Sequence, residues 1–94
     1  MDDQHLFDEL LQAAARLGVE VRIEPFETPA TMGGGLCVVR GEKLVLIDQR
    51  APLPDRIRAL ARALLELQSE TVYMAPEARE LIEAIRGDWN LRIE

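Results

Sequence analysis

Hydrophobic residues along the chain follow helical spacing in three segments. The first helix is expected to begin after Asp2 or Asp3, either of which can cap it, and to end at Gly18. The third is expected to open at Pro76 and to end at Gly87. The apolar stripes of the three helices are Leu6, Phe7, Leu10, Leu11, Ala14 and Leu17; Ile57, Leu60, Ala61, Leu64 and Leu67; and Ala78, Leu81, Ile82 and Ile85.

Three other segments have the pattern of strands. Residues 19–24 alternate strictly between apolar and charged side chains, as in a strand with one buried face. Residues 36–40 and 43–48 predict two further strands, joined by a two-residue type II′ turn at Gly41-Glu42. Residues 44–47 are apolar on both faces, which indicates a central strand covered on both sides, or covered on one side with a partner on the other.

Two shorter segments predict additional strands. Residues 71–74 are expected to form a short strand, and the tail alternates through Trp89, Leu91 and Ile93, which predicts an edge strand. The expected order is α-β-β-β-α-(β)-α. This order defines an α+β fold, in which a small, mostly antiparallel sheet of three to four strands packs against about three helices. Residues 1–94 are expected to form a single domain.

Composition excludes several classes of protein. Hydrophobic residues make up 48% of the 94 positions and aromatic residues only 4%, so we expect a core of Leu, Ile, Val and Ala. A net charge of -6 argues against general nucleic-acid binding, which depends on Lys and Arg. The chain has no run of about 18 apolar residues, so no membrane span is predicted. A single cysteine and an acidic N-terminus without a signal-peptide pattern lead us to expect a cytoplasmic location.

The residues that metal and nucleophile chemistry would need are scarce. The chain has one histidine, His5, and one cysteine, Cys37, so no metal site and no cofactor is predicted. A nucleophilic cysteine usually requires a nearby base, and nothing in the sequence places His5 beside Cys37. We therefore expect Cys37 to be buried and structural.

The segment 25–37 is a candidate binding loop. Its three glycines, Gly33, Gly34 and Gly35, could cradle a ligand with Cys37 beside them. Phosphate loops normally lead into a helix, whereas this segment leads into a strand and lacks the Gly-Lys-Ser/Thr ending. A hinge or close backbone packing is therefore favoured over a ligand site, and the ligand site stays an alternative.

Charged and aromatic residues suggest candidate interfaces. Arg58 and Arg62 give the second helix a basic side, either a solvated face or a docking surface for an acidic partner. Glutamates on the third helix offer an acidic counterpart, so self-association is possible. Trp89, with Leu91 and Ile93, would either complete the core or anchor an interface.

The hairpin followed by a helix resembles part of the ImmA/IrrE-type zinc metallopeptidases. Residues 44–48 match the strand that precedes the catalytic helix in that family, and residues 60–66 match the helix itself. The positions of the His-Glu-x-x-His motif would be Arg62, Ala63 and Glu66. Both histidines are absent, so no zinc or catalytic role carries over. The resemblance covers about a third of the chain and implies a relative with a non-catalytic role.

The sequence therefore predicts a small, non-catalytic protein that acts through protein–protein contacts and forms a homodimer. Two alternatives stay open. One is a small enzyme or ligand binder that uses the loop 25–37 with Cys37. The other is an accessory subunit of a larger, bacterial-type complex.

Overall fold

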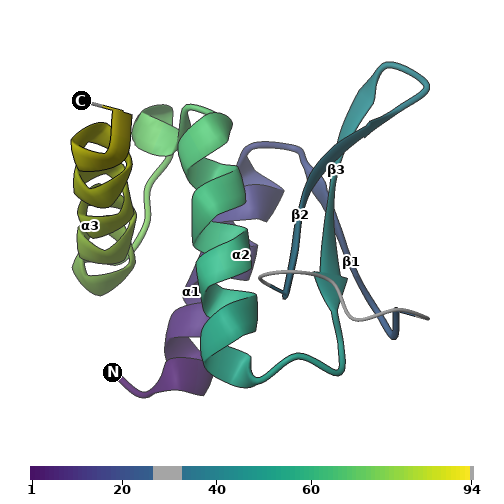
Figure 1. Ribbon diagram of the computed structural model, residues 1–94, viewed down its shortest axis with the longest axis horizontal. Helices are drawn as coiled ribbons and strands as arrows, with labels where there is room; N and C mark the ends of the chain where they lie inside the picture. Colours follow the sequence, from purple (N-terminus) through teal and green to yellow (C-terminus); the bar gives the residue numbers. More distant parts are fainter. Residues whose placement is uncertain (27–32, 94) are drawn as a thin grey trace.

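The computed structural model describes residues 1–26 and 33–93, with side chains as far as Asp88. Three helices and a three-stranded sheet confirm the predicted α+β class (Figure 1). The elements in chain order are α1 (Asp3–Arg16), β1 (Glu20–Glu24), β2 (Gly34–Val39), β3 (Glu42–Asp48), α2 (Leu53–Glu66), the 3₁₀ helix η2 (Ser69–Thr71) and α3 (Pro76–Ile93).

The sheet has the order β1-β3-β2, with β3 in the centre. Strands β2 and β3 are antiparallel neighbours, with Leu36 opposite Val45. Strand β1 runs parallel to β3 on its other side, with Val21 opposite the same Val45. The sheet is therefore mixed and not mostly antiparallel, because β1 joins β3 and not β2, the strand that follows it in sequence.

All three helices lie on one side of the sheet. In Figure 1, α1 and α2 lie next to the sheet and α3 lies on their far side. Helix α2 contacts both other helices as well as β2 and β3, so it is the centre of the core. Fully buried residues come from every layer: Leu10, Val45, Ile47, Leu60, Leu64 and Ile82.

The start of α1 confirms the cap expected from sequence. The Asp2 carboxylate accepts a hydrogen bond from the backbone N–H of His5 at 2.8 Å, which satisfies one of the free donors at the helix N-terminus. Helix α2 has no side-chain cap, but Pro52 precedes it and Pro54 lies in its first turn, where the missing N–H costs nothing.

The C-terminal segment differs from the prediction. Helix α3 continues through Gly87 to Ile93, so neither a helix end at Gly87 nor an edge strand over 89–93 forms. Gly87 does not have the positive φ that a left-handed helix end requires. Trp89 and Ile93 are four residues apart, so the spacing that suggested a strand also fits one helical turn. The tail therefore adds a helical turn and no strand.

Residues 71–74 also form no strand. Ser69–Thr71 is a 3₁₀ helix, and arginine side chains take the place of a strand partner. Arg79 donates to the carbonyl oxygens of Ser69 at 3.2 Å and Val72 at 2.7 Å. Arg16 donates to the Tyr73 carbonyl at 3.1 Å. These bonds fix the connection between α2 and α3.

The turn of the β2–β3 hairpin lies one residue earlier than predicted. Val39 pairs with Glu42, so the two turn residues are Arg40 and Gly41. Their φ angles are 52° and 83°. Positive φ at both positions defines a type I′ turn, whose twist matches that of the strands. The type II′ turn predicted at Gly41-Glu42 is therefore wrong, and Arg40 adopts a left-handed conformation that is costly for a residue other than glycine.

Candidate functional site

Part of the predicted binding loop can be placed. Residues 27–32 lie outside the described residues. Before them, the backbone N–H of Phe26 donates to the Asp48 carboxylate at 3.3 Å, and that of Arg50 donates to it at 3.0 Å. Asp48 is only 5% exposed. Its carboxylate therefore joins the chain after β1 to the chain after β3, which is a structural role.

Gly33 and Gly34 permit close contact between backbones. Gly33 has φ +80°, and a Cβ there would lie 2.9 Å from the Asp55 carbonyl oxygen in the first turn of α2. Gly34 has φ +134°, and a Cβ there would overlap the Leu46 carbonyl oxygen. Both positions therefore require glycine for packing. This geometry favours the packing interpretation over the ligand-binding one.

Gly35 differs from the two glycines before it. Its φ is not in the left-handed region, and a Cβ there would meet open space. The fold of one chain therefore does not require glycine at this position. Glycine within a strand weakens the strand. One usual reason for a glycine at such a position is that another backbone approaches it closely.

Cys37 is half-buried and not buried as expected. It pairs with Leu44, whose side chain lies outside the core that Val45 and Ile47 share with the helices. Alternation along the strands therefore places Cys37 on the face opposite the helices. The thiol has one weak contact, at 3.9 Å to the Gly35 carbonyl oxygen.

Strand β2 is an edge of the sheet. Within the described part of the chain, β3 is its one neighbour. Val38 and Val39 are 66% and 48% exposed. No residue from Gly34 to Val39 is charged, so this edge lacks the charges with which proteins usually prevent pairing with another chain.

Strand β1 is the opposite edge, and it is charged. Glu20, Arg22 and Glu24 alternate along it, and the Arg22 Nε lies 3.4 Å from a Glu20 carboxylate oxygen. Charged side chains of this kind protect a sheet edge. Within the described part of the chain, the two edges of this sheet are therefore chemically different, and β2 is the one without charges.

The turn also determines which backbone groups of β2 are free. In a two-residue hairpin the residues that flank the turn, here Val39 and Glu42, form a hydrogen-bonded pair. Such pairs alternate along an antiparallel ladder, so Cys37 also bonds to β3. Leu36 and Val38 therefore direct their N–H and C=O groups away from β3.

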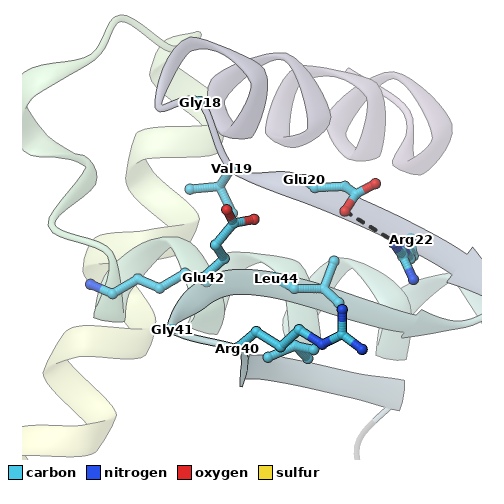
Figure 2. Close-up of a pocket in the computed structure, with 10 residues that line it drawn as sticks. Gly18, Val19, Glu20, Arg22, Arg40, Gly41, Glu42 and Leu44 are labelled. Atoms are coloured by element: carbon cyan, nitrogen blue, oxygen red, sulfur yellow. Dashed lines mark ion pairs between the residues drawn. The ribbon is translucent and has the colours of Figure 1, made fainter.

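A hollow of about 950 Å³ lies at the end of the sheet where β1 begins and β2 turns into β3 (Figure 2). Its charged lining is mixed, and Arg22 is already paired with Glu20 within it. Two separate segments, 18–22 and 39–44, form this hollow, which is why the sequence did not reveal it. Its lining has three basic residues, Arg22, Arg40 and Lys43, against Glu20 and Glu42, so a net charge of one selects only weakly between an anion and a cation.

The predicted interface arginines lie on α2. Arg58 is exposed and Arg62 is half-buried. Arg56 belongs to the fold, because its Nε donates to the Ala51 carbonyl at 3.0 Å and its guanidinium lies 5.7 Å from the centre of the Phe7 ring. Trp89, Leu91 and Ile93 belong to α3, and their side chains are outside the described residues.

Residues that could support metal chemistry are dispersed. Residues 1–26 and 33–93 contain no group of three His, Cys, Asp or Glu side chains that could hold a metal ion. His5 lies on α1 with its Nε2 3.8 Å from a Glu9 oxygen.

No helix within residues 1–26 and 33–93 has both the length and the apolar character to cross a membrane. Comparison with family models, curated proteins and solved structures finds no match.

Proposed function

We propose that this protein is non-catalytic and acts through protein–protein contacts, associating with itself through β2. The observation that supports the proposal is the uncharged edge of β2, on which Val38 is 66% exposed. Exposed edges of this kind pair readily with another strand. Closed two-fold dimers are the commonest homo-oligomers.

The charges of the alternative edge, β1, restrict the registers in which it could pair with its own copy. Antiparallel pairing of β1 with its own copy about Arg22 would place Arg22 opposite Arg22 and Glu20 opposite Glu24, whereas an axis at Val21 or Ile23 would place Arg22 opposite a glutamate. Like charges directly opposite each other destabilise a sheet. Pairing of β1 with β2 would avoid these contacts, but it is a head-to-tail contact that can add further copies without closing into a dimer. Pairing of β2 with β2 is therefore favoured.

Residues of α2 support the non-catalytic part of the proposal. If the resemblance to the metallopeptidases holds, Ala63 would occupy the position of the catalytic glutamate, and Ala63 is buried. An alanine cannot accept a proton, and Arg62 cannot replace a histidine ligand because guanidinium has no lone pair to donate to a metal. We infer that any relationship to that family is one of fold alone.

Sedimentation equilibrium on the full chain tests the proposal. We expect a monomer–dimer equilibrium that Val38→Lys shifts to monomer, because a lysine on an edge strand opposes its pairing with another strand. Ile23→Lys is the matched control, since Ile23 is 39% exposed on the β1 edge, and it should leave association unchanged. Thermal melts of both variants establish that they fold.

Two outcomes would contradict the proposal. A full-length chain that stays monomeric at high micromolar concentration would exclude self-association and would favour an accessory subunit whose β2 pairs with a different protein. Equal dissociation by Val38→Lys and Ile23→Lys would show that association does not depend on the β2 edge.

A further inference from the structure

We propose that β2 pairs with β2 of a second copy about a two-fold axis at Cys37, so that Leu36 of each copy pairs with Val38 of the other. The inference rests on the proposed function and specifies the arrangement of its interface. It would join two three-stranded sheets into one six-stranded sheet, with the helices of both copies on the same side.

Backbone geometry limits the choice of register. Only residues whose N–H and C=O point away from β3 can bond to a second copy, and within regular β2 these are Leu36 and Val38. A two-fold axis perpendicular to the sheet passes midway between one residue and its own copy. The axis can therefore lie at Leu36, Cys37 or Val38.

Two of these three registers use irregular backbone. An axis at Leu36 would require Gly34 as the bonding partner of Val38, but Gly34 has φ +134° and contacts the backbone of Leu46. An axis at Val38 would require Arg40 as the bonding partner of Leu36, but Arg40 has φ 52° within the turn. An axis at Cys37 uses Leu36 and Val38 alone. It is the register in which all bonding residues have regular strand geometry.

The Cys37 register also accounts for Gly35. In this register Gly35 lies opposite Val39 of the second copy, on the face away from the helices. Gly35 leaves open space at its Cβ, and Val39 is 48% exposed. The valine of one copy would cover the bare backbone of the other, a contact that a single chain cannot provide.

Cross-linking of the full-length protein tests the register. Two Cys37 residues at the axis form a non-hydrogen-bonded pair with Cα atoms about 4.5 Å apart, within the range of a disulfide. We expect copper–phenanthroline, which supplies the oxidant, to convert the dimer into a disulfide-linked species. The control is Cys37→Ser with Val39→Cys, in which the two thiols are offset by four residues, about 13 Å along the strands.

This control distinguishes register-specific pairing from random collision, which deletion of the thiol alone would not do. Val39 is exposed whereas Cys37 is half-buried, so random collision would cross-link position 39 faster. Register-specific pairing predicts the reverse, with loss of the linked dimer in the control. Cross-linking of the control but not of the natural chain, in a protein that sediments as a dimer, would overturn the register and leave self-association intact. A chain that sediments as a monomer would overturn both.

Discussion

Gly34 lies so close to Leu46 that a Cβ on Gly34 would overlap the Leu46 carbonyl oxygen. Gly33, immediately before it, contacts the backbone of Asp55 at the start of α2. The first residues of β2 are therefore held between the central strand and the central helix. This contact sets where β2 enters the sheet and which of its backbone groups face outward.

We expect Gly34→Ala to lower the free energy of unfolding by about 3 kcal/mol, since the substitution adds both a backbone clash and an unfavourable φ. Urea denaturation monitored by circular dichroism measures the change. Gly35→Ala is the matched control, because position 35 has open space and an ordinary φ. It should change stability by less than about 1 kcal/mol. Equal losses at the two positions would refute the packing role of Gly34.

Replacement of Arg40 by asparagine should stabilise the protein by about 1 kcal/mol. Arg40 has φ 52° at the first position of a type I′ turn, where asparagine followed by glycine is strongly preferred. Arg40→Gln removes the same charge but keeps the unfavourable conformation, so it should not stabilise. Thermal melts of the two variants compare them. If Arg40→Gln stabilised as much as Arg40→Asn, the gain would come from charge and not from the backbone.

Proline at position 38 should dissociate the dimer without unfolding the chain. The Val38 N–H is expected to point away from β3, so its removal costs the monomer no ladder bond. Cys37→Pro removes an N–H directed at β3 and should destabilise the fold itself. Sedimentation and melting together distinguish the two effects. A Val38→Pro variant that melts like Cys37→Pro would show that the hydrogen-bond alternation of β2 is assigned the wrong way round.

Asp48→Ala should destabilise the protein by about 1 to 3 kcal/mol, because two backbone N–H groups would lose their acceptor. Asp48→Asn keeps a carbonyl oxygen at the same place and should lose less. Chemical denaturation of both variants ranks their free energies of unfolding. An alanine variant as stable as the natural chain would show that water replaces the carboxylate without cost.

A chelator should leave the melting temperature unchanged. The chain has one histidine and one cysteine, too few for the ligand sets of usual structural zinc sites. Differential scanning calorimetry with and without EDTA checks the expectation. A clear fall in melting temperature with EDTA, reversed by added zinc, would require a site built from carboxylates.

Local features of the fold were predictable, and long-range ones were not. The Asp2 cap and the apolar stripes depend on residues three or four positions apart, so sequence spacing reveals them. Alternation in β1 shows which face of the strand is buried but not which strand is its neighbour. The parallel pairing of β1 with β3 therefore could not be read from the sequence.

The same limit applies to the candidate site. The sequence places Gly33, Gly34, Gly35 and Cys37 together in one segment, and Gly33 and Gly34 have the close backbone packing that the sequence favours over a ligand site. That β2 is an edge depends on strand order, which spacing does not encode. Exposure of Val38 and Val39 has a different cause: they lie beside the turn, where their partners Lys43 and Glu42 on the central strand are exposed as well.

The central position of β3 has a consequence for how the sheet assembles during folding. Strand β3 comes last in sequence but provides the pairing for both other strands. The β2–β3 hairpin closes across two residues, so it can form within microseconds. Partners on β1 and β3 are 24 residues apart, and that longer closure costs more chain entropy. A nascent chain that ends before Glu42 would therefore hold two unpaired strands, and the uncharged β2 would be the one most exposed to aggregation until β3 emerges.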